Sequence, residues 1–193
     1  MKNNEQNQRP DSNWASKLTT FALAYGFLNK AYYSPPAGAF IQALVDDDLF
    51  AEWPIMTEDE QTQAGLNLLQ IFADNWHESQ LADLKQDHAR LFVGPDRVLA
   101  PPWESVYLST DHLVFERQTV EVRAFYGRFN LQAPNLNVEP DDHIGLELAF
   151  MAHLYALGLQ AITQNNADEL ETSLQAQREF LTDHLLRWAP QFC

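Results

Sequence analysis

The sequence predicts an all-α protein, a single-domain helical bundle of six to seven or more helices with a long proline-rich loop. Three observations support this fold class. The chain of 193 residues has only 7 glycines, which argues against a turn-rich β-sandwich or barrel. Leu, Ala, Gln and Glu, which favour helices, are plentiful. Apolar residues also recur every three or four positions through most of the chain, as in amphipathic helices, and we find no convincing strand.

The first helix should begin after a polar start. Residues 1–13 have no apolar core of a secretory signal, and we expect a disordered tail followed by one all-helical domain over residues 14–193. Ser12 or Asn13 could cap the helix, which should end before Ser34-Pro35-Pro36, because the residue before a proline avoids the α conformation. Its apolar stripe comprises Trp14, Leu18, Phe21, Tyr25 and Leu28.

Helix-breaking and capping residues indicate the limits of the next two helices. A short helix is expected across Ala37–Phe50, and Trp53-Pro54 interrupts the chain after it. Thr57 and Glu60 have the three-residue spacing of a capping box, which predicts a third helix that continues to about Trp76.

A fourth helix and a long connection follow. Ser79 is a candidate N-cap for this helix, which should end at Gly94-Pro95. Gly94–Pro102 contains three prolines and a glycine, so we expect a long loop, and ordered loops of this length are usually functional. The pattern over Trp103–Val114 fits either a helical turn or an extended segment.

The second half of the chain contains the most apolar helix. A helix is predicted from Thr119 through Phe129, followed by a loop over Asn130–Val138. Ile144–Leu159 is apolar on nearly every side, which is typical of the centre of a bundle. Leucines at heptad-like spacing predict a last helix over about Ala167–Trp188, and Pro190 should close it.

Charge and cysteine content restrict the possible functions. The formal net charge of −15 would repel nucleic-acid phosphates and anionic lipids and attract cationic partners such as basic peptides. The single cysteine, Cys193, cannot build a disulfide framework. No segment reaches 18 uninterrupted apolar residues, so we expect no stable membrane insertion and a cytoplasmic location.

Glu139-Pro140-Asp141-Asp142-His143 precedes the most apolar helix and has two interpretations. In the first, Pro140 occupies the first helical turn and the two aspartates lie near the positive end of the helix dipole. A cation is disfavoured at that end, so His143 should be neutral and hydrogen-bonded, to Asp142 or Glu139. In the second interpretation, these polar groups form a recognition site. The motif alone does not separate the two.

An enzymatic alternative uses the same residues. Glu139, Asp142 and His143 could hold a metal ion in a metal-dependent helical-bundle hydrolase, although a zinc site would need further ligands from elsewhere in the chain. The sequence has no glycine-rich phosphate loop and no Gly-x-Ser-x-Gly motif. The inventory of catalytic motifs is therefore thin, and we expect no cofactor.

A second group of residues is centred on the proline-rich loop. Leu91-Phe92-Val93-Gly94-Pro95 is followed by Pro101-Pro102-Trp103. These residues either end a helix and pin the loop to the core, or they form the rim of a groove. Rigid prolines and an aromatic ring beside carboxylates would suit a peptide with apolar and basic residues.

Together, the segments Leu91–Pro95, Pro101–Ser105 and Glu139–Gly145 resemble the TorD/DmsD/NarJ family of redox-enzyme maturation chaperones, most closely its DmsD-like branch. The Glu-Pro-x-Asp-His motif is the hallmark of this family. The resemblance implies an all-α chaperone without catalytic turnover. It also implies a partner, the twin-arginine leader peptide and precursor of a molybdoenzyme catalytic subunit, which the chaperone holds back from export until the cofactor is inserted.

The resemblance also implies which residues bind the peptide. They are Leu91, Phe92, Pro102, Trp103, Glu139, Pro140, Asp142 and His143. In physical terms, the carboxylates of Glu139 and Asp142 would pair with the arginines, and the apolar side chains would meet the apolar part of the leader. Two positions depart from the DmsD pattern: His88 and Asp96 stand where that branch has aromatic residues.

Overall fold

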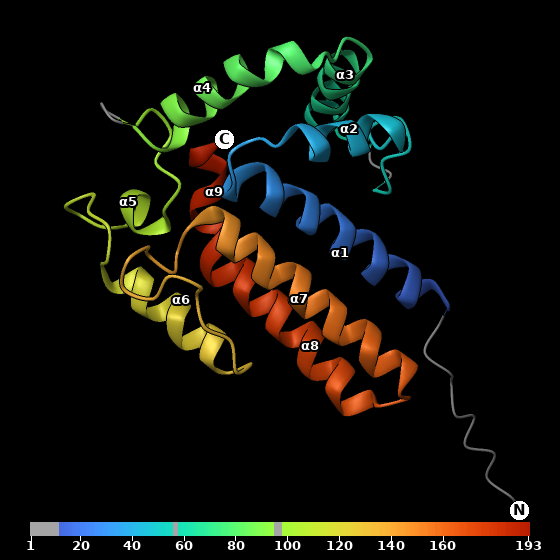
Figure 1. Ribbon diagram of the computed structural model, residues 1–193. Helices are drawn as coiled ribbons and strands as arrows, with labels where there is room; N and C mark the ends of the chain where they lie inside the picture. Colours follow the sequence, from blue (N-terminus) through green and yellow to red (C-terminus); the bar gives the residue numbers. More distant parts are fainter. Residues whose placement is uncertain (1–11, 56–57, 95–97) are drawn as a thin grey trace, which may run out of the picture.

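The computed structural model describes residues 12–55, 58–94 and 98–193, and these form an all-α fold (Figure 1). The α-helices are α1 (Ser12–Tyr33), α2 (Gly38–Asp46), α3 (Glu60–Asp74), α4 (Leu81–Phe92), α5 (Glu104–Leu108), α6 (Arg117–Gly127), α7 (Ile144–Thr163), α8 (Ala167–Phe180) and α9 (Leu186–Phe192). A short 3₁₀ turn, Glu78–Gln80, precedes α4, and a π-helical segment, Leu181–Leu185, joins α8 to α9. The described residues contain no strand beyond an isolated bridge between Trp103 and His143. The predicted fold class is confirmed.

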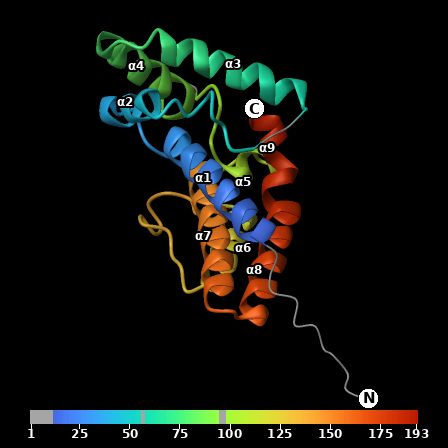
Figure 2. The same cartoon turned by 90° about the vertical axis from the view of Figure 1, so that its right-hand side faces the viewer.

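Helices α1, α7 and α8 lie side by side and form the body of the protein (Figures 1 and 2). Helices α2, α3 and α4 lie across one end of this body in both views. The last turn of α9 reaches the end of α4, where the Phe92 and Phe192 rings lie 6.0 Å apart. The chain terminus therefore helps to attach the α2–α4 layer to the body.

Helix α7 is the central element, as its apolar character predicts. The side chains of Met151, Leu154 and Ala161 have no exposed surface. The helix is long and apolar enough to cross a membrane by length and composition, but 61% of its most apolar stretch is buried inside the fold. Its composition is accounted for by its place in the core.

The structure refines the predicted boundaries in the first half of the chain. Residues 12 and 13 belong to α1, and the rest of the predicted tail lies outside the described residues. Thr57 also lies outside them, and Asp59 caps α3 instead by accepting a hydrogen bond from the Thr62 backbone N–H at 2.7 Å. Ser79 does not cap α4, because it lies inside the 3₁₀ turn.

Among the proline-containing segments, the one at Pro190 differs from the prediction. Residues 98–103 are not helical, while residues 95–97 of the predicted loop are outside the described part of the chain. Pro190 lies inside α9 rather than after the last helix. Helix α9 begins at Leu186, directly after the π-helical segment. Helical hydrogen bonding continues past Pro190, because the Cys193 N–H donates to the Ala189 carbonyl at 3.0 Å.

Gly145 sets the distance between α1 and α7. A Cβ atom at this position would lie 2.5 Å from Cβ of Tyr33 and 2.9 Å from its Cα, which is closer than non-bonded carbon atoms approach. The Asn29 amide fixes the same contact by donating a hydrogen bond of 2.7 Å to the Gly145 carbonyl. The two backbones can approach this closely only because residue 145 has no side chain.

We predict that Gly145→Ala destabilises the fold by about 1–3 kcal/mol, because the added methyl group must displace the α1 backbone. Chemical denaturation would measure the loss. Gly26→Ala is the matched control: a Cβ at Gly26 meets nothing within 4 Å, so there alanine should stabilise α1 by up to about 1 kcal/mol through its helix propensity. Equal effects of the two substitutions would contradict the close contact.

Candidate functional site

Asp142 is fully buried and joins three segments of the chain. One carboxylate oxygen accepts the Ser105 backbone N–H at 2.7 Å, and the other accepts the Thr119 hydroxyl at 2.6 Å. Its backbone carbonyl accepts the Glu104 N–H at 3.0 Å. Asp142 thus satisfies two of the free N–H groups at the start of α5 and connects them to α6.

The neighbouring Asp141 fixes the same turn to α6. Its carboxylate pairs with the Arg123 guanidinium at 2.7 and 3.1 Å, and its carbonyl accepts the Tyr126 hydroxyl at 3.1 Å. A further backbone bond of 2.8 Å runs from the Ile144 N–H to the Pro102 carbonyl. Both aspartates therefore hold the loop before α7 against α5 and α6.

The helix that follows the motif begins later than the first interpretation predicts. Pro140 lies four residues before Ile144, where α7 starts, so its predicted place in the first helical turn is wrong. Asp141 and Asp142 form a turn, and His143, which bridges Trp103, has an extended backbone directly before α7. His143 is instead the N-cap, and its Nδ1 accepts the Gly145 N–H at 3.0 Å.

His143 is neutral, as predicted, although its principal partner is the backbone rather than Asp142 or Glu139. Burial, and then repulsion from a protonated His88, lower the pKa of His143 to about 4. The rings of Tyr33 and Trp103 meet His143 edge-on, with centroid distances of 5.4 and 5.9 Å. A neutral ring that accepts a hydrogen bond suits this position at a helix N-terminus.

Glu139 is the member of the motif with an accessible carboxylate. Its side chain is 26% exposed, and its Oε1 lies 3.9 Å from Nε2 of His143. The Tyr33 hydroxyl donates a hydrogen bond of 3.0 Å to its other oxygen. Burial and this bond raise the pKa of Tyr33 to about 12. Glu139 is thus oriented by α1 while its carboxylate stays within reach of a ligand.

A network of buried polar groups lies behind the motif. Nδ1 of His184, in the π-helical segment, lies 2.9 Å from Oε2 of Glu104, and the Trp188 indole donates to Glu147 at 3.1 Å. Glu104 and Glu147 have no exposed surface, and Oε1 of each has no hydrogen-bond partner among the described residues. Two buried carboxylates repel one another, which favours the protonated form of one of them. Burial, and then the charge of Glu104, raise the pKa of Glu147 well above its ordinary value.

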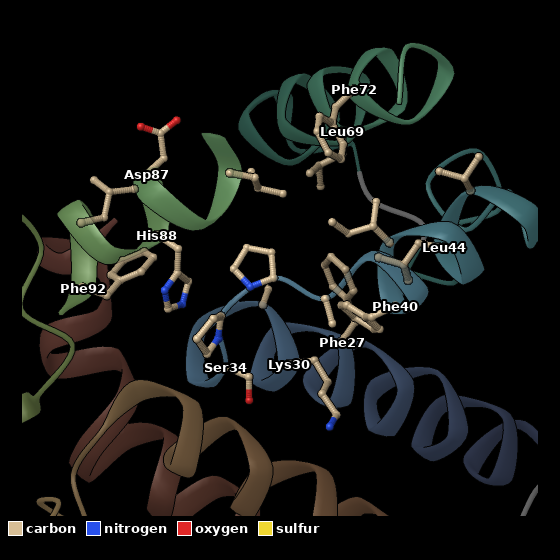
Figure 3. Close-up of a pocket in the computed structure, with 18 of the residues that line it drawn as sticks. Phe27, Lys30, Ser34, Phe40, Leu44, Leu69, Phe72, Asp87, His88 and Phe92 are labelled. Carbon is tan, nitrogen blue, oxygen red and sulfur yellow. The ribbon is translucent and has the colours of Figure 1, made fainter. Parts of the chain in front are cut away.

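An apolar pocket of about 500 Å³ lies between α1 and the α2–α4 layer (Figure 3). Its walls include Phe27, Phe40, Leu69, Phe72, Leu91 and Phe92. Lys30, Ser34, Asp87 and His88 are the polar residues of the lining. The pocket is therefore suited to apolar groups, with a few polar contacts on its border.

The end of α1 connects this pocket to the Glu139–His143 motif. Lys30 and Ser34 line the pocket, whereas Tyr33, between them in sequence, contacts Glu139 and His143. The Tyr32 ring packs edge-on against Phe92 at 5.9 Å. The pocket and the motif thus lie on the two sides of one helical turn.

The predicted site residues separate into two groups. Leu91 and Phe92 line the pocket, and Trp103 and Glu139 are partly exposed. Pro102, Pro140, Asp142 and His143 are buried and support these residues from behind. The pocket walls contributed by α1, α2 and α3 were not predicted from the sequence. An apolar helix face does not indicate whether the rest of the protein will cover it or leave it open to a ligand.

Negative charge is concentrated on the layer that forms the pocket. Residues 38–92, which span α2–α4, contain eleven acidic residues and two basic ones, Lys85 and Arg90. The eleven are Asp46, Asp47, Asp48, Glu52, Glu58, Asp59, Glu60, Asp74, Glu78, Asp83 and Asp87. The electrostatic field around the pocket therefore favours a cationic ligand.

The geometry does not support the metal-dependent alternative. Both carboxylate oxygens of Asp142 accept protein hydrogen bonds, and Nδ1 of His143 accepts the Gly145 N–H. Among the described residues, no group of three or more His, Cys, Asp and Glu side chains is arranged to hold a metal ion.

We predict that Glu147→Gln becomes increasingly stabilising, relative to the native protein, as the pH rises from about 5 to about 8. A carboxyl group whose pKa is raised on folding contributes stability that is lost as the pH rises above its unfolded pKa. Glutamine keeps the acceptor for Trp188 but cannot ionise. Thermal melts across this pH range would measure the difference, and a pH-independent difference would contradict a protonated Glu147.

Comparison with known proteins identifies the family. Residues 57–193 match the family model described as nitrate reductase delta subunit. "Chaperone protein TorD" of Vibrio cholerae is 33% identical over 162 residues, which cover 83% of this chain and 67% of that protein. "Tat proofreading chaperone DmsD" of Salmonella typhi is 30% identical over 164 residues, which cover 83% of this chain and 69% of that protein.

These relatives agree with the sequence motifs and with the all-α fold. The matches to proteins named TorD and DmsD have similar identities, so they show the family as a whole rather than one branch of it. The chain belongs to the TorD/DmsD/NarJ family of redox-enzyme maturation chaperones, which are all-α proteins and not enzymes.

Proposed function

We propose that this chaperone binds the twin-arginine leader peptide of a molybdenum-cofactor oxidoreductase precursor in the cytoplasm and holds the precursor back from export during maturation. The observation that carries the proposal is the apolar pocket between α1 and α2–α4, whose walls include Leu91 and Phe92. One relative, the DmsD of Salmonella typhi, is named a Tat proofreading chaperone, which agrees with the proposal.

The shape and lining of the pocket suit the apolar part of such a leader. Its volume of about 500 Å³ would hold several aliphatic side chains, and its phenylalanine rings provide apolar walls on several sides. Moving a leucine side chain from water into such a site contributes about 1.5–3 kcal/mol. Most of the affinity should therefore come from this contact.

The charges near the pocket suit the arginine pair. Glu139 presents a partly exposed carboxylate that Tyr33 holds in place, and Asp87 lies on the pocket border. Arginine forks pair well with carboxylates, although an exposed pair contributes only about 0–1 kcal/mol. We infer that the carboxylates select the arginines and that the acidic layer attracts the leader over a longer range.

The buried residues of the family motif have a supporting role in this proposal. Asp142 has no surface for a ligand, and His143 is only 5% exposed. We therefore assign Asp142, His143, Pro102 and Pro140 to positioning, and Leu91, Phe92, Trp103 and Glu139 to direct contact with the leader. This assignment replaces the expectation that Asp142 itself pairs with an arginine.

Leu69 and Leu68 offer a matched test of the pocket. Leu69 lines the pocket, whereas its neighbour Leu68 is 67% exposed and does not line it. We expect Leu69→Ala to weaken binding of a synthetic twin-arginine leader about 5- to 20-fold, because apolar contact area is lost. Leu68→Ala should leave the affinity unchanged. Calorimetric titration measures both, and equal affinities of the two variants would argue against this pocket.

The role of Glu139 can be separated from general electrostatics. We predict that Glu139→Gln weakens binding of a leader with an Arg-Arg pair about 2- to 5-fold and leaves binding of the same leader with Gln-Gln unchanged. Glu171→Gln, an equal change of charge on the exposed surface of α8, is the control. If Glu171→Gln reduces the affinity as much as Glu139→Gln does, the effect of Glu139 is only that of net charge.

A further inference from the structure

We infer that His88 is a specificity-determining residue of the apolar pocket, where its ring hydrogen-bonds a hydroxyl-bearing side chain, serine or threonine, within the apolar part of the bound peptide. This inference deepens the proposed function and rests on it. It assigns a polar contact to a site that is otherwise apolar, at a position where the resemblance to the DmsD-like branch leads one to expect an aromatic residue.

His88 combines burial with an unsatisfied polar atom. The residue lies on α4, is 8% exposed, and lines the pocket. Its Nε2 is buried and makes no hydrogen bond within the protein. Figure 3 shows the ring extending from α4 into the pocket beside Phe92, whose ring it meets edge-on at 5.2 Å.

An unpaired nitrogen in this position needs an explanation. A buried polar group without a partner costs about 1–3 kcal/mol, and most such groups in proteins are paired. The other polar side chains of the lining, Lys30, Ser34 and Asp87, do not bond Nε2. Asp87 instead pairs with Arg90 at 3.2 Å. The unused hydrogen-bonding capacity of His88 is thus directed toward whatever occupies the pocket.

The surroundings of His88 determine the chemistry of its partner. Burial lowers the pKa of His88, so the ring is neutral at neutral pH and has one donor and one acceptor nitrogen. A hydroxyl group can complement either tautomer, since it both donates and accepts. A charged side chain would lose too much hydration among the phenylalanine rings. A single serine or threonine among aliphatic residues satisfies Nε2 and fits the apolar walls.

The test uses a panel of synthetic twin-arginine peptides with an apolar run of Leu and Ala. Each peptide has one Thr in the run, at successive positions, and is paired with a peptide that has the isosteric Val at the same position. Calorimetry measures affinity for the native protein, for His88→Phe and for His88→Leu. Either variant suffices if only one of them folds, and circular dichroism establishes folding. Arg90→Ala, an exposed change on the same helix, is the control.

For the native protein and for Arg90→Ala, we expect the Thr peptide to bind about fivefold or more tightly than the Val peptide at one position or two. His88→Phe and His88→Leu should lose or reverse this preference. The inference is overturned if no position shows a Thr preference, or if the preference persists without the imidazole. If the native protein binds none of the peptides, the proposed function itself fails, and this result is distinct from equal binding of Thr and Val peptides.

Discussion

The buried carboxylate of Asp142 is the interaction on which the candidate site depends. It bonds the start of α5 through Ser105 and bonds α6 through Thr119, while its own chain continues directly into α7. Three segments that are distant in sequence meet at this one side chain. Burying a carboxylate without hydrogen-bond partners is costly, so the positions of the partners of Asp142 are closely determined. Trp103 and Glu139 lie close in sequence to this junction, which therefore fixes their positions.

In the proposed function, different residues support the site and contact the leader peptide. Asp141, Asp142 and His143 face inward, as do the pairs Glu104–His184 and Glu147–Trp188, which fix α5 to the π-helical segment and α7 to α9. The pocket is built differently, from apolar faces of α1–α4 that the rest of the described chain leaves uncovered. Tyr33 connects the two regions, because it contacts the motif while its neighbours in α1 line the pocket.

The all-α fold could be predicted from the sequence because helical periodicity and the scarcity of glycine are local signals. The neutral state of His143 also followed from a local argument about helix N-termini. The apolar run predicted from Ile144 also begins where α7 begins. Only the place of Pro140 in the first helical turn was wrong, because a turn at Asp141 and Asp142 and the bridge between His143 and Trp103 separate it from α7. That bridge joins positions 40 residues apart, so local patterns do not predict it.

The site was predictable only in part, for the same physical reason. Leu91 and Phe92 were identified through the family motif, and they do line the pocket. The walls from α1–α3 could not be predicted, because the sequence pattern of an amphipathic helix is the same whether a neighbouring helix or a ligand covers its apolar face. Glu147 is a charged residue within an otherwise apolar stretch of the sequence, but its hydrogen-bond partner, Trp188, is determined by tertiary packing.

The central claim, that the apolar run of a leader peptide occupies the pocket between α1 and α2–α4, can be tested directly by photo-crosslinking. A synthetic twin-arginine leader with a photoreactive phenylalanine in its apolar run would be irradiated with the full chain, and the crosslinked residues would be mapped by mass spectrometry. We predict crosslinks to the pocket lining, such as Phe40, Leu69 and Phe72. Crosslinks concentrated on the exposed apolar residues Leu113, Phe115 and Val120 would contradict it.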